Sequence, residues 1–292
     1  MHYPILTPEA AAALIIHGET LGLSGFTTAG AAKAVPLALA ARARAEHAAG
    51  RELRVNVFTG ASMLGEADEA LAQAGVVQLR MPYQSSPGMR AAVNAGEVEY
   101  VDAHLSGMAQ MLRMGVLPRV NTAIIEVCDV TDEGELTLTA SLGNSAVFCR
   151  QAERIILELN TYHKPLLREV HDICELPPPP YPQPVGICTP EDRIGARTLR
   201  VDPRKIVGVV YTHQPDRLAC YKEPTAETTR IGELIADFLA AEYRAGRLPG
   251  RDCIVLQSGV GNIANAALKA IGRAVDFPPI KMYTEVLTDA AL

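Results

Sequence analysis

The sequence predicts an α/β protein: an open, mostly parallel sheet covered by helices, followed by the beginning of a second, similar α/β domain. Short apolar runs of strand length alternate with alanine-rich or amphipathic stretches of helical length. Several of these runs end in turns of small residues. The alternation lapses between 160 and 205 and then resumes. This lapse favours a domain boundary between about 213 and 224, with domains at 1–215 and 216–292.

The first elements follow from caps and periodicity. Thr7 is expected as an N-cap, with Pro8 at the first helical position and Glu9 in the first turn, so a helix begins here and runs to about 17. A strand at 20–23 leads into a turn of small and hydroxyl residues at 24–30. The later elements of the first domain are expected as helices at 33–47, 66–74, 88–95 and 104–114, strands at 52–58, 76–80, 98–101, 120–130, 136–140 and 154–159, and one more helix opening at Gly143-Asn144-Ser145.

Two of these strands are expected to form a hairpin, because Asp132-Glu133-Gly134 is a turn sequence between the runs at 120–130 and 136–140. Beyond 160 the chain is irregular, and the four prolines at 177–180 indicate an extended, rigid crossing. A strand is expected at 205–212. A long helix is expected to start at Thr225 and end near Arg244.

The stretch from Cys253 to Asp289 predicts a strand, a glycine turn, a helix and a second strand. Cys253 to Leu256 is the first strand, and Asn262 is expected to cap a helix that ends at Gly272. The second strand is expected at 280–286, with Glu285 near its carboxyl end. Ligands of open α/β sheets bind beyond the carboxyl ends of the strands. The turn and Glu285 both belong to that edge.

Three hypotheses for this unit stay open on pattern alone. Gly259-x-Gly261-x-x-Ala264 fits a dinucleotide fingerprint, with an acid about 20 residues further on. Alternatively, Glu285 is a nucleophile beside a glycine turn whose amides bind a developing oxyanion. In the third hypothesis the glycines only allow close packing of helix against strand, and Glu285 is a solvated residue at a strand end.

Composition excludes several classes of function. The apolar fraction of 48% is ample for a core, and 27 basic against 33 acidic residues give a net charge of −6 without a basic cluster, so no nucleic acid partner is expected. The sequence has no apolar run of membrane-spanning length and no basic signal region. We therefore expect a cytoplasmic protein without membrane contact. The six cysteines form no C-x-x-C pair, and the seven histidines lack ligand spacing, so no metal site is expected.

Other candidate residues carry weaker signals. His104, His213 and the His171-Asp172 pair are expected to be structural or at the surface. Ser62 and Ser145 lack the G-x-S-x-G elbow of a hydrolase. The turn from Gly25 to Gly30 is compatible with phosphate binding through backbone amides and equally with a simple tight turn.

Taken together, the motifs resemble family I CoA-transferases, in the acetyl-CoA hydrolase/transferase branch that includes succinyl-CoA:acetate CoA-transferases. The segments run in family order through all 292 residues: Gly25-Phe26-Thr27 through Lys33-Ala34-Val35-Pro36, Thr59-Gly60-Ala61-Ser62, Arg80-Met81-Pro82-Tyr83-Gln84, Asp102-Ala103-His104-Leu105-Ser106, Gly143-Asn144-Ser145, Asp192-Arg193-Ile194-Gly195, Gln214-Pro215-Asp216, Gln257-Ser258-Gly259-Val260-Gly261-Asn262 and Tyr283-Thr284-Glu285-Val286.

The resemblance implies specific roles. Glu285 would be the covalent nucleophile of a ping-pong reaction that passes through an acyl-glutamyl anhydride and a glutamyl-CoA thioester. The segment Gln257, Ser258, Gly259, Val260, Gly261 and Asn262 would bind CoA and stabilise the oxyanion. Gly25, Phe26 and Thr27 would form a substrate loop. Acyl-CoA and small carboxylic acids would be the substrates, coenzyme A would be a substrate rather than a cofactor, and no metal would be needed.

Two departures from the family pattern carry expectations of their own. Ala31-Ala32 precede Lys33 where the family usually has a second glycine and a Pro-Lys pair. Family chains also continue well past the glutamate, into a half that helps to bind CoA and complete the oxyanion hole. We therefore expect the second domain to be truncated at Leu292 and the 292-residue chain alone to have little activity. A homodimer or a complementary C-terminal chain is the expected assembly, and an inactive half that binds a partner is the alternative.

Overall fold

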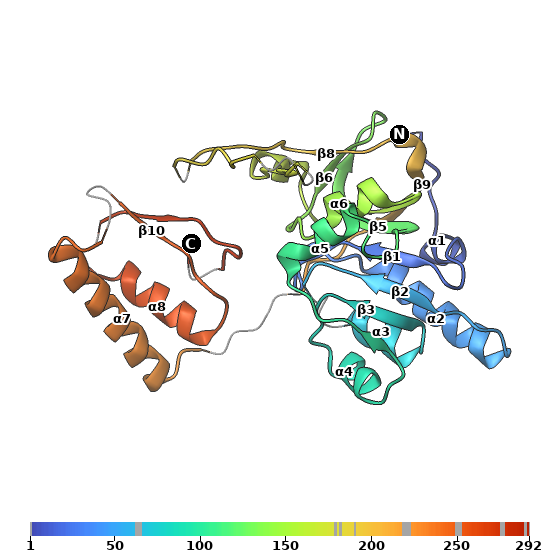
Figure 1. The fold of residues 1–292 in the computed structure, drawn as a ribbon, viewed down its shortest axis with the longest axis horizontal. Coiled ribbons are helices and arrows are strands. Elements are labelled where there is room, and N and C mark those ends of the chain that lie inside the picture. Colours follow the sequence, from blue (N-terminus) through green and yellow to red (C-terminus); the bar gives the residue numbers. More distant parts are fainter. Residues whose placement is uncertain are drawn as a thin grey trace. The chain divides into compact units, whose positions relative to one another are not determined.

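The computed structural model describes residues 2–61, 66–177, 180, 183–189, 191–217, 223–248, 253–274, 278–288 and 291. The chain divides into two compact units, which we call the first and the second unit (Figure 1). The first contains Met1–Val185 and Ile194–Leu218, and the second contains Gly186–Arg193 and Ala219–Leu292. The assignment of domains to 1–215 and 216–292 remains a prediction.

A mostly parallel sheet forms the centre of the first unit, which confirms the predicted fold class. Strands β4-β3-β2-β1-β5-β7-β9 lie side by side in this order, and each pairs in parallel with its neighbours. Their bounds are β1 Thr20–Leu23, β2 Val55–Phe58, β3 Val77–Met81, β4 Glu99–Tyr100, β5 Thr122–Val130, β7 Arg154–Asn160 and β9 Ile206–Thr212. The strand order reverses between β1 and β5, the position where such sheets open a crevice.

The long strand β5 gives the sheet a branch. Its first half pairs with β1, while its far end pairs with the antiparallel strand β6 (Glu135–Leu138), which completes the predicted hairpin. A short strand that was not predicted, β8 (Leu199–Arg200), extends this branch from the irregular segment. Because β6 occupies the edge of β5 beyond the end of β1, the chain after β1 must leave the sheet as a turn.

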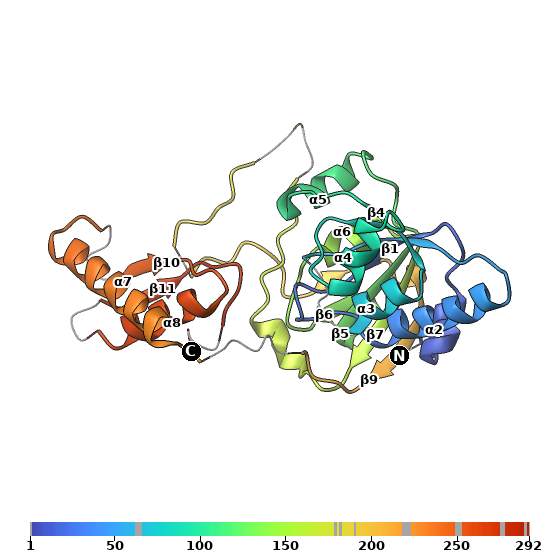
Figure 2. The same cartoon turned by 90° about the horizontal axis from the view of Figure 1, so that it is seen from below.

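Helices cover both faces of this sheet (Figure 2). Alternate strand residues such as Leu23 and Val57 belong to a core shared with α1 to α4, while Phe58 and Ile125 belong to a second core that includes residues of α5 and α6. The bounds are α1 Pro8–Ala13, α2 Ala34–Ala48, α3 Glu66–Gln73, α4 Pro87–Asn94, α5 Leu105–Arg113 and α6 Ser145–Gln151. The predicted helices therefore exist, although α1 ends before residue 17.

Local capping explains where the helices begin. The Thr7 hydroxyl accepts a hydrogen bond from Ala10 N at 3.1 Å, as predicted. Thr225 does the same for Thr228 N at 3.2 Å and starts α7 (Ala226–Arg244). The first unit also contains two 3₁₀ turns between its regular elements, at Pro165–Glu169 and Pro203–Lys205. Pro178 and Pro179 of the proline run, and Ser62 and Cys220, lie outside the described residues.

The second unit contains the predicted strand, turn, helix and strand. Strand β10 (Ile254–Leu256) pairs in parallel with β11 (Ile280–Met282), and α8 (Asn262–Gly272) connects them. Two details of the prediction were wrong. Gly261 rather than Asn262 is the N-cap of α8, and β11 ends at Met282 rather than at 286. Glu285 therefore follows the strand in a bend instead of standing on it.

Within the described residues no helix combines the length and apolarity required to cross a membrane.

Candidate functional site

Glu285 lies in the second unit at the carboxyl ends of β10 and β11. The last ladder hydrogen bond runs from Tyr283 N to Leu256 O at 3.0 Å. One residue later, the Thr284 hydroxyl donates to Ser258 O at 2.9 Å and accepts from Ser258 N at 3.4 Å. The bend that carries Glu285 is thus tied directly to the loop after β10. Its side chain is exposed, so the carboxylate is not enclosed by apolar neighbours of this unit.

The loop at 257–261 connects β10 to the N-terminus of α8. Gly261 has φ +131° and ψ 171°, a conformation that only glycine adopts readily. A Cβ atom added at Gly259 or Gly261 would meet no described atom within 4 Å. The hypothesis that these glycines serve close packing of helix against strand is therefore wrong for the described residues. Instead they leave open space in front of the first turn of α8, where backbone N–H groups lack intrahelical partners.

This loop has the chemistry of an anion site. The N-terminus of an 11-residue helix carries a partial positive charge and free N–H donors. Gln257, Gly259 and Val260 are exposed, and Ser258 is half-buried. The hydroxyl of Ser258 turns back to Gly259 O at 3.0 Å, and the Gln257 amide donates to Ser258 O at 2.9 Å.

In the first unit, three of the glycine turns singled out in the sequence meet beyond the ends of β1 and β2. A Cβ atom at Gly60 would lie 2.4 Å from Gly25 O, and one at Gly143 would lie 2.7 Å from the same oxygen. The Asn144 side chain donates to Thr59 O at 3.0 Å. These motifs, far apart in sequence, therefore form one packed junction.

The turn at 25–30 is closed by its own backbone and by side chains. Phe26 and Ala29 exchange two hydrogen bonds of 3.0 Å, and Gly30 N donates to Asp216 Oδ1 at 3.2 Å. Gly25 is buried at φ +120°, and Phe26 and Thr27 are half-buried, Thr27 at φ +51°. Since the amides of Phe26, Ala29 and Gly30 already have internal partners, the structure favours the tight turn over the phosphate site, the two alternatives that the sequence left open.

The N-terminus of α2 is also occupied internally. The buried Glu158 carboxylate of β7 accepts hydrogen bonds from the amides of Lys33, Ala34 and Val35 at 2.7, 3.0 and 2.7 Å. Burial raises the pKa of Glu158, against the lowering effect of the three amides. The helix dipole and these donors supply the positive environment that a buried carboxylate requires.

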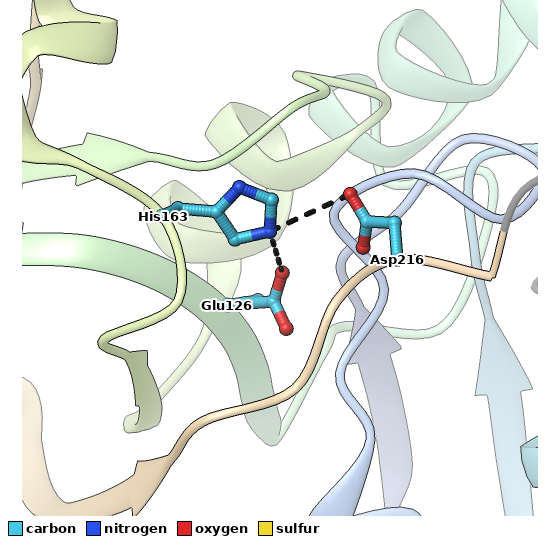
Figure 3. Close-up of side chains that lie close together, drawn as sticks. All are labelled: Glu126, His163 and Asp216. Carbon is cyan, nitrogen blue, oxygen red and sulfur yellow. Dashed lines mark ion pairs between the residues drawn. The ribbon is translucent and has the colours of Figure 1, made fainter.

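A charged cluster that the sequence did not predict lies beside this helix end. The Lys33 ammonium binds the carboxylates of Glu126 on β5 and Asp216 after β9, the latter at 2.9 Å. Figure 3 shows His163, which follows β7, with Nε2 facing both carboxylates, 4.0 Å from Glu126 and 3.6 Å from Asp216. Asn160 and Thr139 also donate to Glu126, at 3.2 and 2.8 Å.

Burial and ion pairing shift the pKa values of this cluster in opposite directions. Burial alone would lower the pKa of Lys33, but the Glu126 charge and the hydrogen bonds to Glu126 and Asp216 outweigh it and raise the pKa. Burial raises the pKa of Glu126, against the lowering effect of Lys33. The cluster is therefore an internal ion network whose cation is a lysine side chain.

The carboxylates and the imidazole also have metal-ligand chemistry. Glu126, His163 and Asp216 place ligand atoms within 4.8 Å of one another. The Lys33 ammonium, however, already contacts both carboxylates, so a metal ion would have to displace it. The sequence did contain a signal for this network, since Glu126 and Glu158 are acids with apolar neighbours on both sides in their strands, and buried charges need partners.

Replacing Lys33 with Met is expected to lower the free energy of unfolding by about 2 kcal/mol near neutral pH, because two carboxylates lose their cation. The folded protein holds the Lys33 proton more tightly than the unfolded chain does. Its contribution is therefore complete below the ordinary pKa of 10.5 and is lost as the pH rises through the folded pKa. Urea unfolding from about pH 7 to pH 11.5 should show wild type and variant converging at the alkaline end. A constant difference would contradict the pairing.

The histidines that were expected to be structural or at the surface have contacts that fit this expectation. His171 contacts Leu138 O at 2.9 Å through Nε2, and Asp172 accepts from the amides of Ile194 and Gly195 at 2.7 to 3.2 Å. His213 bonds Thr161 at 2.9 Å, and His104 is the N-cap of α5. His171 and Asp172 therefore bind backbone groups of different segments, which favours a structural role for each of them.

A family model described as acetyl-CoA hydrolase/transferase N-terminal domain matches residues 2–211. A propanoyl-CoA:succinate CoA transferase of Escherichia coli (strain K12) is 38% identical over 287 residues, which cover 98% of this chain and 58% of the relative. An acetyl-CoA hydrolase of Schizosaccharomyces pombe is 36% identical over 283 residues, which cover 94% of this chain and 53% of the relative.

The fold also matches solved structures. The crystal structure of RipA from Yersinia pestis superposes with a TM-score of 0.69 at 20% sequence identity, covering 99% of this chain and 57% of that one. At this identity the likeness shows a shared fold alone. The chain spans about half the length of the curated relatives it matches.

Proposed function

The chain belongs to the acetyl-CoA hydrolase/transferase family, and on that premise we propose that it transfers coenzyme A between an acyl-CoA and a small carboxylic acid, with Glu285 as the covalent nucleophile. The resemblance inferred from nine ordered segments is confirmed by these comparisons, and membership in an enzyme family with it. The observation that carries the assignment of Glu285 is its exposed position on a bend tied to the glycine loop at 257–261.

The proposed reaction has two halves. The Glu285 carboxylate attacks the thioester carbonyl, and CoA thiolate leaves to give an acyl-glutamyl anhydride. The thiolate then attacks the glutamyl carbonyl of the anhydride, which releases the first carboxylic acid and leaves a glutamyl-CoA thioester. A second carboxylate repeats both steps in reverse and takes the CoA. A carboxylate is a weak nucleophile that becomes effective when it is held against its target.

Each of these attacks develops a negative charge on a carbonyl oxygen. We assign the stabilisation of this oxyanion to backbone amides of Gly259, Val260, Gly261 and Asn262, at the N-terminus of α8. Support comes from the free donors of the helix end and from the open space in front of both glycines. One such donor contributes about 3 kcal/mol to a transition state of this kind.

Hydrolysis of acetyl-CoA is the second candidate, and the 36% identity to an acetyl-CoA hydrolase favours it equally. It uses the same glutamate, since water that attacks the acyl-glutamyl anhydride, after CoA thiolate has left, releases the free acid and regenerates the Glu285 carboxylate. The two activities then differ in how well water is excluded from the intermediate. The acyl donor, the acceptor acid and an assembly as a homodimer or with a complementary chain remain proposals for the whole protein.

Reductive trapping tests the proposal. The complete protein is incubated with an acyl-CoA and then with borohydride, which reduces the glutamyl thioester to an alcohol. Peptide mass spectrometry should locate the change at Glu285. A change at another residue, or none in an active preparation, would remove the proposed nucleophile.

Thermal unfolding with CoA and with NAD tests the dinucleotide hypothesis, because only a bound ligand raises the melting temperature. A rise with CoA and no rise with NAD would remove that hypothesis.

A further inference from the structure

The side chain of Thr284 continues the β10–β11 ladder after the backbone ladder has ended. The parallel register pairs Leu256 with Met282, and Tyr283 N donates to Leu256 O. In a regular parallel ladder the next bond would run from Ser258 N to Tyr283 O. Here Ser258 N donates instead to the Thr284 hydroxyl, which in turn donates to Ser258 O at 2.9 Å.

The same hydroxyl spans Glu285. Its distance to Val286 O is 3.2 Å, so one oxygen contacts backbone atoms of Ser258 and of the residue after the glutamate. Glu285 thus stands on a short arch of backbone, 284–286, whose two ends are joined by this side chain. A second threonine, Thr288, donates to Asn265 Oδ1 in the first turns of α8 at 3.2 Å and fixes the chain beyond the arch.

Within the described residues, the Thr284 hydroxyl makes every hydrogen bond between the arch and the loop at 257–261. No further hydrogen bond joins the loop to the arch in the part of the chain that the structure describes. Removing this hydroxyl would therefore let the arch and the loop move independently, while the ladder of β10 and β11 stays intact.

We propose that Thr284 is a positioning residue, whose hydroxyl holds the backbone of Glu285 at a fixed separation from the amides of the glycine loop. This inference rests on the proposed function of Glu285. Attack on a thioester requires the carboxylate to reach the carbonyl carbon while the oxygen of the same carbonyl meets the loop amides. A displacement of about 1 Å between the two groups costs about 10²-fold in rate.

Two substitutions separate the hydroxyl from the shape of the side chain. Thr284→Val keeps the β-branched shape and removes every contact of the hydroxyl, while Thr284→Ser keeps the hydroxyl. In the complete protein Thr284→Val should lower kcat by about 10²-fold with KM for acyl-CoA within about threefold of wild type. Thr284→Ser should restore kcat to within about fivefold.

Hydrogen exchange of the peptide covering 257–262 provides a measurement that does not depend on activity. The exchange rate of this peptide should rise by about fivefold in Thr284→Val, as expected for the loss of one net hydrogen bond. In Thr284→Ser the rate should return towards the wild-type value. Thr225→Val is the matched control, because it removes a capping hydroxyl from α7 of the same unit and should change neither kcat nor exchange of the loop.

The outcomes distinguish this inference from the proposed function. A Thr284→Val enzyme with kcat within threefold of wild type overturns the positioning role, as does unchanged exchange of the loop. Equal losses of kcat in the Val and Ser variants also overturn it, because the hydroxyl would not be responsible. If wild type forms no adduct at Glu285, the proposed function fails, and the exchange experiment alone decides whether the hydroxyl holds the loop.

Discussion

Replacing Glu285 with Gln should lower kcat for CoA transfer by about 10⁴- to 10⁶-fold, with little change in KM for acyl-CoA. Gln has the same shape, but its neutral amide cannot form the anhydride or the thioester. The loss therefore falls on the chemical step and not on binding. Because Glu285 is exposed, the substitution should leave the melting temperature unchanged.

Steady-state kinetics with the complete protein and intact-mass analysis check this result together. Glu285→Asp retains the carboxylate but draws it back by one methylene, so an intermediate loss of about 10²-fold is expected. The control is Glu233→Gln, which removes an exposed carboxylate from α7 that is paired with Arg230 and should keep full activity. A Glu285→Gln enzyme with more than a tenth of wild-type turnover would contradict the assignment.

The largest effect on stability is expected from Arg80. Replacing it with Met should lower the free energy of unfolding by about 3–5 kcal/mol, because a buried pair loses one partner and the other charge stays buried. Arg80 and Asp68 are both fully buried, 3.3 Å apart. The guanidinium also donates to Thr59 Oγ1 at 2.8 Å and to Met81 O at 2.7 Å. These bonds hold the turn at Thr59-Gly60, which packs against Gly25.

Urea unfolding followed by circular dichroism measures this loss. Arg230→Met is the matched control, since Arg230 forms an exposed pair with Glu233 one helical turn away and should cost less than about 0.5 kcal/mol. Combining Arg80→Met with Asp68→Leu should recover part of the loss, because no charge then remains buried. A loss below about 1 kcal/mol for Arg80→Met alone would show that the pair does not matter to the fold.

Much of the fold could be predicted from local patterns. The N-cap threonines, Thr7 and Thr225, start their helices as expected, because capping involves only the next three residues. The strand, turn, helix and strand of the second unit also follow from periodicity and from Gly261. The two errors in this unit, the N-cap and the length of β11, concern boundaries that depend on backbone angles and pairing partners rather than on apolar spacing.

Other features could not be predicted, because they depend on contacts between distant residues. Strand β8 consists of two residues that pair with β6, and its sequence alone carries no strand signal. The Lys33 network joins residues up to 183 positions apart. Glu126 and Glu158 mark buried polar sites, but their partners became evident only when β5 and β7 lay side by side.

By itself, the sequence determined the order of the helices and of every main strand except β8, the family, and the position of Glu285 and its glycine loop at the same edge of a parallel sheet. These features depend on spacing along the chain, which caps, turns and periodicity record directly. The tertiary structure alone decided that Glu158 occupies the start of α2, that Lys33 is the cation between Glu126 and Asp216, and that Thr284 ties Glu285 to the loop. The reason is that strand register sets these distances, and register is a property of paired segments that no single segment contains.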